Sequence, residues 1–347
     1  MNENKRNYGI DILRIIAMTY VVILHCLGHG GRIMISSTVL RDYKISRFLE
    51  IFVYSAVDIF GIISGYVMCD KKIKYSNLII IWVEVVFYSL IITIIYDIYN
   101  PTLVTISDYI KAIMPISFRY YWYITAYFGM MLLAPLIQKG TNELSKINAR
   151  RILFVIIIFF SIIESVFNIF QLNNGYSVIW LLILFLIGIL IKKSDFKIKK
   201  FYLFINILFL TIFTWYYCFY GFESNNIIVF NKQLFLSYVS PTVLINAISY
   251  LLLFKSIKFN DFINKIIKYF SPSALAIYLL NDNPLIRVNL IYKRFVKYYE
   301  KGEGYMLLQI LLFTILFVIL SLIIDKIRIY LFKRINIKKN INKLGID

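Results

Sequence analysis

The sequence predicts an all-α fold, a polytopic membrane helix bundle of about ten transmembrane helices with both termini in the cytoplasm. Of its 347 residues, 60% are hydrophobic and 18% are aromatic, and the mean hydropathy is +0.73. Soluble domains are usually nearer half apolar. Apolar segments of the roughly 20 residues that a spanning helix needs follow one another along the chain. Basic residues punctuate these segments and so indicate the topology.

The expected spans follow one another with short polar or basic connectors between them. They are Ile10–Leu27, Phe48–Cys69, Leu78–Ile98, Tyr121–Gln138, Ile152–Phe170, Val178–Ile191, Phe201–Tyr220, Leu234–Phe254, Ser273–Leu290 and Tyr305–Ile324. The last span is followed by a basic segment.

The distribution of Lys and Arg sets the orientation. With the N-terminus in the cytoplasm, 25 of the 38 Lys and Arg residues lie on the cytoplasmic side, 12 lie outside and Arg14 lies in the membrane. Cytoplasmic loops carry such an excess. The net charge of +19 is spread over the connectors between spans. This distribution favours membrane lipids as the partner of the basic residues and excludes nucleic acid.

Two outside segments, Arg32–Arg47 and Arg287–Lys301, are exceptions because they mix basic and apolar residues. Within the second, IYKRFVKYY (Ile291–Tyr299) is typical of an amphipathic helix on the membrane surface. We expect a further interfacial segment at Pro101–Ser117.

Several classes of site are missing from the sequence. Cys26, Cys69 and Cys218 lie in or beside apolar segments, and their odd number favours free thiols. Two histidines and scattered cysteines form no metal-ligand spacing, so no metal is expected. The chain has no P-loop, no GxSxG elbow and no dinucleotide fingerprint.

The first span carries a polar stripe within GIDILRIIAMTYVVILHCLGHGG (Gly9–Gly31). At 100° per residue Asp11, Arg14 and His25 share one helical face, and Arg14 and His25 are about 16 Å apart along the axis. One interpretation is an ion pair of Asp11 with Arg14 and a His25 that reaches the outer interface. The other is a polar cavity inside the bundle, because intramembrane ionisable residues usually mark a pathway or a site.

The chemistry of these side chains favours a site. Imidazole titrates near neutral pH and suits general-base work. A guanidinium stays charged and matches phosphate oxygens. His29, the only other histidine, follows the span in LGHGG and is expected to have a loop role.

Other spans contain acids that need partners. Asp58 lies in the middle of the second span, followed by Gly61, Ser64 and Gly65, which permit a close helix approach. Glu84 and Glu164 lie in the third and fifth spans. The sequence alone does not assign a partner to any of these carboxylates.

Aromatic and polar clusters mark the span ends. Trp122 and Tyr123 fit either an aromatic belt at the interface or a sugar-stacking role. Pro284 ends the ninth span, directly after Asn281, Asp282 and Asn283. Lysines at 71, 72 and 74 fit the inner leaflet, with phosphate binding as a second interpretation.

Four segments, in order, resemble the acyltransferase 3 family of integral membrane O-acyltransferases. GIDILRIIAMTYVVILH resembles the family's first helix, with Asp, Arg, a small residue and His. IFGIISGYVM is similar to its F-x-x-SG-[YF] second helix, YWYITAYFGMMLLAPLI to its W-Y-containing fourth helix, and SALAIYLLNDNPLIR to its penultimate Y-L helix. The set implies one integral membrane acyltransferase-like domain over 1–347, of which 325–347 form a basic cytoplasmic tail.

The resemblance implies a polysaccharide O-acetyltransferase activity. An acyl group, most often acetyl, would pass from cytoplasmic acetyl-CoA, the co-substrate, to a hydroxyl of an envelope or capsular polysaccharide or a lipid-linked sugar. The enzyme would lie in the plasma membrane, and the Lys-, Asn- and Ile-rich composition suggests a bacterium.

Site residues follow from the same resemblance and from the stripe. His25 is the expected general base, and Asp11 and Arg14 complete the catalytic group. Donor binding is expected from Arg14, Lys72, Lys74 and Ser64, and acceptor binding from Trp122, Tyr123, Asp58, Glu164 and Asn281. The stripe would then line a tunnel from donor to acceptor.

Two positions depart from the family's pattern. Many members carry Arg-x-x-Arg at the start of the third helix, where this chain has KKIKYSNLII. It therefore offers lysine ammonium groups, which act as point charges, in place of planar guanidinium groups that bind phosphate with two hydrogen bonds. Many also carry a His after the Y-L motif, where this chain has Asn281, which cannot act as a base near neutral pH.

Two other functions compete with acyl transfer. In a polysaccharide-precursor exporter or flippase the stripe would line a passage and His25 would only bind. A polysaccharide polymerase or ligase is less favoured, because such proteins usually have a large outside loop with arginines and the outside loops here are about 20 residues or shorter.

Overall fold

The computed structural model describes residues 6–31, 43–220, 234–343 and 345. Within this part of the chain the regular structure is helical and contains no strand. The α-helices of the first half are α1 Tyr8–Gly28, α2 Lys44–Val53, α3 Ala56–Met68, α4 Tyr75–Tyr99, α5 Ile106–Ile113, α6 Trp122–Thr141 and α7 Lys146–Ile157. Those of the second half are α8 Glu164–Phe167, α9 Val178–Ser194, α10 Lys200–Tyr220, α11 Pro241–Lys255, α12 Asp261–Phe270, α13 Ala274–Asn281, α14 Pro284–Ile286, α15 Glu303–Arg334 and α16 Ile337–Asn342.

The prediction of an all-α membrane bundle is confirmed. Five helical stretches in the described residues are long and apolar enough to cross a membrane: Tyr8–Gly28, Lys44–Met68, Tyr75–Tyr99, Lys200–Cys218 and Glu303–Arg334. Each of the ten expected spans contains helix, but several are shorter or interrupted. A π-helical turn, Ile158–Ile163, joins α7 to α8 in the fifth.

Local chemistry explains where the helices begin and end. The side chains of Asn7, Ser177 and Asn260 accept hydrogen bonds from backbone N–H groups in the first turns of α1, α9 and α12, which satisfies donors that the helix leaves open. The eighth span becomes helical only at Pro241, which occupies the first turn of α11. The tenth continues through Arg334, the end of α15.

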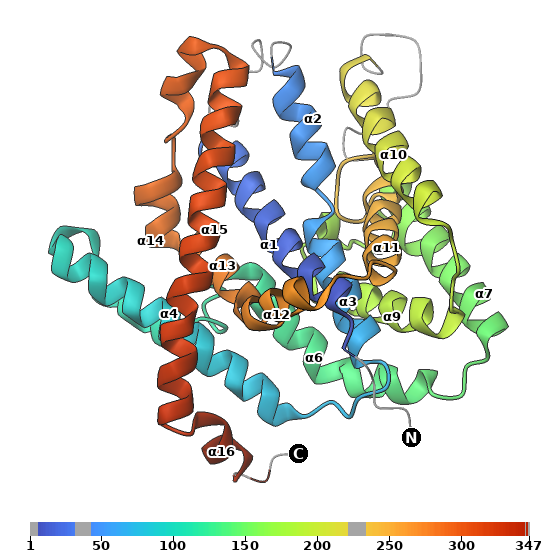
Figure 1. The fold of residues 1–347 in the computed structure, drawn as a ribbon, viewed down its shortest axis with the longest axis horizontal. Helices are drawn as coiled ribbons and strands as arrows, with labels where there is room; N and C mark the ends of the chain where they lie inside the picture. Colours follow the sequence, from blue (N-terminus) through green and yellow to red (C-terminus); the bar gives the residue numbers. More distant parts are fainter. Residues whose placement is uncertain (1–5, 32–42, 221–233, 344, 346–347) are drawn as a thin grey trace.

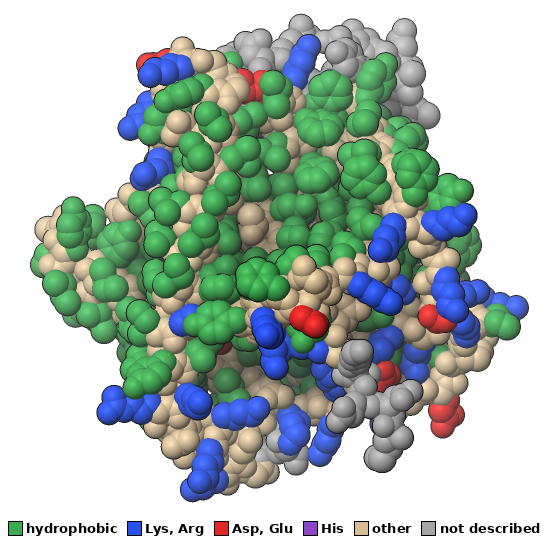
Figure 2. All heavy atoms as spheres, in the orientation of Figure 1, with side chains coloured by type: hydrophobic (Ala, Val, Ile, Leu, Met, Phe, Trp, Pro, Cys, Tyr) green, Lys and Arg blue, Asp and Glu red, His purple; other side chains and the backbone are tan. Residues whose placement is uncertain are grey.

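The helices arrange the chain so that both ends lie at one end of the bundle (Figure 1). The first helix, α1, runs through the middle and contacts α3, α11, α13 and α15. Lys and Arg side chains gather around the end that holds the termini, and a broad apolar surface lies above them (Figure 2). We call the end with the termini the inner end and the opposite one the outer end.

The tightest contact in the core joins α3 to α9. A Cβ at Gly65 would lie 1.8 Å from the Phe185 carbonyl oxygen, and one at Gly188 would lie 2.2 Å from the Ile62 carbonyl oxygen. The two backbones therefore touch, as small residues at membrane helix contacts allow. This is the close helix approach that the second span predicts.

We expect Gly188→Ala to destabilise the protein by about 1–3 kcal/mol, because the added methyl meets backbone and not a movable side chain. Thermal unfolding of the purified protein in nanodiscs measures this. Gly140→Ala in α6 is the matched control, since no atom lies within 4 Å of its Cβ position. Equal melting temperatures for both variants would contradict the backbone contact.

The outside segments differ in how well the sequence predicts them. The interfacial segment at 101–117 contains α5, which exposes Ile106, Ile110 and Ile113. The prediction of one amphipathic helix over Ile291–Tyr299 is wrong, because this stretch ends a π-helical turn, passes through turns and enters a 3₁₀ helix. Most of Arg32–Arg47 lies outside the described residues.

A specific contact explains the irregular outside segment. The backbone N–H groups of Lys293 and Phe295 donate to the carbonyl oxygens of His29 and Gly30, at 3.1 and 2.9 Å. Phe295 is buried. The segment thus bonds to the end of α1, which a surface helix could not do because its own N–H groups would be used internally.

Candidate functional site

The polar stripe on α1 divides into an inner ion-pair cluster and an outer histidine. Asp11 is buried, and its two carboxylate oxygens accept hydrogen bonds from Arg6 Nε at 2.5 Å and from Arg14 Nη1 at 3.2 Å. The ion pair expected at the start of the helix is therefore present. His25 lies three turns further along and faces a cavity.

This outer cavity has a volume of about 360 Å³ and lies beside the last turns of α1. Three of the predicted site residues, His25, Trp122 and Tyr123, line it. The complete lining is Met18, Val21, Leu24, His25, Gly28, His29, Glu50, Tyr54, Ala56, Val57, Phe60, Trp122, Tyr123, Tyr176, Tyr238, Tyr278, Asp282 and Arg287. Such a volume, mostly apolar with a few polar groups, is typical of a small-molecule site.

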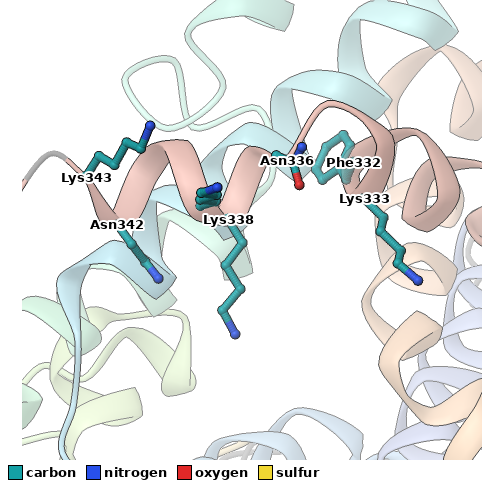
Figure 3. A pocket seen from close by; sticks show the side chains of 7 residues that line it. Phe332, Lys333, Asn336, Lys338, Asn342 and Lys343 are labelled. Carbon is teal, nitrogen blue, oxygen red and sulfur yellow. The ribbon is translucent and has the colours of Figure 1, made fainter.

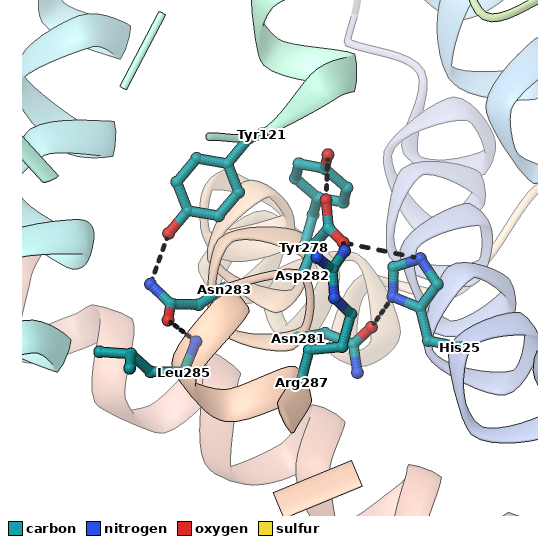
Figure 4. A network of polar contacts seen from close by, with 8 residues as sticks. All are labelled: His25, Tyr121, Tyr278, Asn281, Asp282, Asn283, Leu285 and Arg287. Carbon is teal, nitrogen blue, oxygen red and sulfur yellow. Dashed lines mark hydrogen bonds and ion pairs between the residues drawn. The ribbon is translucent and has the colours of Figure 1, made fainter. Parts of the chain in front are cut away.

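Asn281 fixes the orientation of His25 (Figure 4). His25 Nδ1 lies 2.5 Å from Asn281 Oδ1. An amide oxygen only accepts hydrogen bonds, so Nδ1 carries the proton and donates it. The lone pair of the neutral ring then lies on Nε2, which is 3.9 Å from Asp282 Oδ1, too far for a hydrogen bond. His25 therefore presents a basic nitrogen at the cavity.

Asp282 supplies negative charge beside that nitrogen. Its Oδ1 accepts a hydrogen bond from Arg287 Nη1 at 3.0 Å, and its Oδ2 accepts one from Tyr278 OH at 2.7 Å. The carboxylate is thereby held in place, 3.9 Å from His25 Nε2. It can stabilise a protonated imidazole in a low-dielectric site. In the sequence Asp282 stands in the NDNP stretch, Tyr278 is the tyrosine of the Y-L motif and Arg287 begins a basic outside segment, but none of the three was selected as a site residue.

A helix break brings these side chains together. Pro284 cannot donate to a helical carbonyl, and α13 ends at Asn281. Asn283 Oδ1 then accepts from Leu285 N at 3.0 Å and caps α14, while Asn283 Nδ2 donates to Tyr121 OH at 2.9 Å. Three consecutive polar residues thus bond to different sets of partners, as Figure 4 shows.

Aromatic rings form one wall of the outer cavity. Ring centroids are 4.6 Å apart for Trp122 and Tyr176, 5.0 Å for Tyr176 and Tyr238, and 5.1 Å for Tyr54 and Tyr238. We call Tyr54, Trp122, Tyr176 and Tyr238 the aromatic wall. Rings of this kind offer flat apolar faces with polar tips. Three of the four come from positions that the sequence analysis did not select.

His29 is the second histidine at the outer cavity. Burial, and then the positive charges that His25 and Arg287 can carry, lower the pKa of His29 to about 4. Its ring is therefore neutral near neutral pH, and it adds no charge to the cavity. Its backbone holds the end of α1 to the outside segment, in keeping with the loop role that the sequence predicts.

A second cavity, of about 480 Å³, lies at the inner end beside the first turns of α1. Arg14 lines it as predicted, but Lys72, Lys74 and Ser64 are not among the described residues that do. The lining of this inner cavity is Arg6, Asn7, Ile10, Asp11, Arg14, Tyr66, Val67, Lys71 and Lys192. Four cations and one carboxylate make it strongly basic, which suits a polyanion.

The lysines of the inner cavity come from two helix ends. Lys71 follows α3, and Lys192 lies in the last turn of α9. Lys192 Nζ is 2.6 Å from Asp70 Oδ2, and this hydrogen bond lowers the pKa of Asp70. Lys192 could not be selected from the sequence, because only the packing of α3 against α9 brings it here.

The two cavities approach each other along α1 without joining. Arg14 lines the inner and Met18 the outer cavity, about 6 Å apart along the helix. No described residue lines both, so the tunnel expected from the stripe is not continuous in this structure. Buried Tyr127 neighbours residues of both cavities: its ring centroid is 6.3 Å from that of Tyr123, and it lies against Ser64 and within electrostatic reach of Arg14.

Two predicted acids lie away from both cavities. Asp58 is completely buried behind the outer cavity, where its Oδ1 accepts from Trp180 Nε1 at 3.1 Å. Its Oδ2 has no hydrogen-bond partner among the described residues. Glu164 uses both oxygens to accept the backbone N–H groups of Phe170 and Leu172, each at 2.8 Å. Neither carboxylate reaches His25.

A groove on the inner end is lined by lysines and lacks acids and histidines. It lies along α16 and the end of α15 (Figure 3) and is formed by Phe332, Lys333, Asn336, Lys338, Lys339, Asn342 and Lys343. In the described part of the chain, no group of three or more His, Cys, Asp or Glu side chains could hold a metal.

Comparison with known proteins gives one match. A family model described as an acyltransferase domain matches residues 7–326. No curated protein and no solved structure matches the chain. The matched range contains the complete outer cavity and the His25–Asn281 pair.

Proposed function

Because the chain belongs to the acyltransferase family whose model it matches over residues 7–326, we propose that it transfers an acyl group, most simply acetyl, from cytoplasmic acetyl-CoA to a hydroxyl of a cell-envelope or capsular polysaccharide. The single observation that carries this proposal is the orientation of His25. Its Nδ1 is bound by Asn281, and its Nε2 faces a cavity with an aromatic wall. The membrane is that of a bacterial cell.

The two cavities fit the two substrates. CoA is a polyanion, and the inner cavity offers Arg6, Arg14, Lys71 and Lys192 against one carboxylate. Arginine suits phosphate through its planar fork, and lysine adds point charges. The aromatic wall offers flat surfaces on which the apolar face of a sugar ring packs. The donor arm has to pass Tyr127 to bring the thioester to the outer cavity.

The reaction needs one base and one hydrogen-bond donor. His25 Nε2 takes the proton from the sugar hydroxyl, whose oxygen attacks the thioester carbonyl carbon. The carbon–sulfur bond then breaks, and the proton passes from His25 to the departing thiolate, which leaves as CoA thiol. Asp282 stabilises the imidazolium between these steps. Tyr123 lines the cavity, and its hydroxyl is buried with no partner among the described residues, so it has to turn toward the substrate to donate to the oxyanion.

The direct test compares surface polysaccharide from a wild-type strain and a deletion strain by proton NMR. At matched polymer yield, the O-acetyl signals should be present in the first and absent in the second. If deletion instead leaves the polymer inside the cell with its O-acetyl groups intact, the protein is an exporter or flippase and the proposal is wrong.

Asn281 should act through His25. We expect Asn281→Leu to lower kcat by about 10²-fold, because the ring loses the acceptor that fixes its orientation. The KM for acetyl-CoA should be unchanged, since the inner cavity is untouched. Initial rates with protein in nanodiscs give both constants.

Asn281→His is the matched variant, because it restores the residue that the family often carries and keeps a polar partner for His25. Its kcat should lie within about tenfold of wild type, which corresponds to a difference in activation free energy of at most about 1.4 kcal/mol. Equal kcat values for Asn281→Leu and Asn281→His would show that Asn281 does not position His25.

A further inference from the structure

A third cavity, of about 340 Å³, lies at the outer end beside the loop that follows α8. Its lining is Glu164, Ser165, Val166, Asn168, Gln171, Asn173, Asn174, Ser237 and Val239. We call it the amide pocket. Its volume is within the range of small-ligand sites, but its walls are polar where those of the outer cavity are aromatic.

The loop that shapes the amide pocket is held in a defined conformation. Asn168, Gln171, Asn173 and Asn174 all have φ between 49° and 53°, a left-handed backbone that is uncommon for residues other than glycine. Buried Glu164 binds two backbone N–H groups of this loop. The expected substrate-binding acid is therefore a residue that positions the loop.

The amide pocket offers many hydrogen bonds and little charge. Glu164 is the one charged residue of its lining, both of its oxygens accept backbone N–H groups, and no Lys, Arg or other acid lines the pocket. The side chains of Asn168, Gln171 and Asn174 make no hydrogen bond within the described residues. Each amide can both donate and accept, which matches the hydroxyls of a neutral sugar better than a phosphate or a carboxylate.

The amide pocket and the outer cavity share a wall. Ser237 lines the pocket and the next residue, Tyr238, lines the outer cavity; likewise Asn174 lines the pocket and Tyr176 the outer cavity. Tyr238 N donates to the Asn174 carbonyl oxygen at 3.2 Å, which joins the two segments. Consecutive Cα atoms are about 3.8 Å apart, so at Ser237 and Tyr238 only the backbone of neighbouring residues separates the two cavities.

We infer that the amide pocket is a second glycan subsite, which holds a neutral sugar unit adjacent to the unit that is acylated in the outer cavity. This inference rests on the proposed function, since it takes the acceptor to be a glycan. It adds that the protein recognises a polymer or oligomer and not an isolated sugar. The aromatic wall binds the reacting unit, and the amide pocket binds its neighbour.

The test removes the amides without straining the backbone. Glycine adopts left-handed φ angles freely, so the double variant Asn168→Gly/Gln171→Gly keeps the loop conformation. Asn336→Gly is the matched control, because Asn336 is also left-handed, with φ 55°, and lies at the inner end before α16. The acceptors are size-fractionated fragments of the host's surface polysaccharide, one repeat unit or several repeats long, with acetyl-CoA as donor.

We expect the KM for multi-repeat fragments to rise at least 10-fold in the double variant, with kcat unchanged and with the control equal to wild type. Binding of the same fragments, followed by tryptophan fluorescence, should weaken by the same factor. A double variant that binds and acylates the long fragments as wild type does would overturn the subsite.

The binding arm separates this inference from the proposed function. Wild-type protein that binds long fragments through the amide pocket but never acylates them would refute acyl transfer and keep the subsite. Wild-type protein that acylates fragments, with the double variant unaffected, would support acyl transfer and overturn the subsite. Wild-type protein that binds no fragment would overturn the subsite as well.

Discussion

Strains that carry His25→Ala in place of wild type should produce surface polysaccharide without O-acetyl signals. Removing a general base typically costs 10²–10⁴-fold in rate, which brings acylation below detection by proton NMR. His25 is the residue whose Nε2 faces the outer cavity with a lone pair. His29 does not replace it, because its own ring has a separate position one turn further on.

The control for this substitution lies on the same helix. The Thr19 hydroxyl donates to the Ile15 carbonyl oxygen at 2.9 Å, and Thr19 lines neither the inner nor the outer cavity. Thr19→Ala should therefore keep the O-acetyl signals at unchanged polymer yield. Signals that persist in His25→Ala would remove His25 from the chemistry. Polymer retained inside the cell would favour transport.

Arg328→Met should destabilise the protein by about 3–5 kcal/mol, the cost of leaving buried charge uncompensated. Arg328 donates to Asp325 through Nε at 2.6 Å and through Nη2 at 3.0 Å, and its Nη2 lies 3.3 Å from Glu84 Oε1. All three residues are buried. Tyr88 OH also donates to Asp325, at 2.7 Å. Without the guanidinium, two carboxylates remain between α4 and α15 with a single hydroxyl donor.

Thermal unfolding in nanodiscs measures this loss. Arg334→Met, at the exposed end of α15, removes an equal charge and should leave the melting temperature unchanged. The triple variant Glu84→Leu/Asp325→Leu/Arg328→Met removes the whole cluster and should recover most of the stability, because a buried ion cluster often contributes little beyond what apolar packing gives. If the triple variant is less stable than Arg328→Met alone, the charge argument is wrong.

Helical periodicity explains what the sequence could predict about the site. Asp11, Arg14 and His25 lie on one helix, so the regular rise and rotation of an α-helix per residue are enough to place them on one face. Likewise Pro284 has no backbone N–H with which to continue the preceding helix, which predicts a break at Asn281 to Asn283. Both predictions depend on residues close together in the chain.

Contacts between distant helices explain what the sequence could not predict. Lys192 reaches the inner cavity because α9 packs against α3, and Glu84 meets Arg328 across more than two hundred residues. Arg328 falls in a segment that composition alone assigns to a basic tail. Which of many charged residues pair across a bundle depends on helix rotation and depth, and neither is encoded in local pattern.

The irregular outside segment illustrates the same limit. IYKRFVKYY has the composition of a surface helix, but the carbonyl oxygens of His29 and Gly30 accept hydrogen bonds from its backbone. Those carbonyls lie just beyond the end of α1, where a helix leaves acceptors open. Tertiary hydrogen bonds thus override a helical preference that is real but weak.

The separation of the two cavities has a consequence for the cell's energy supply. In the proposed function the two substrates come from opposite sides of an energised membrane, and the protein has to pass an acyl group without becoming a pore. One turn of α1, with Tyr127 and Ser64 beside it, separates the basic inner cavity from the outer one. We expect this separation to keep protons and small ions from flowing down their gradients between turnovers, so that the resting protein dissipates no membrane potential.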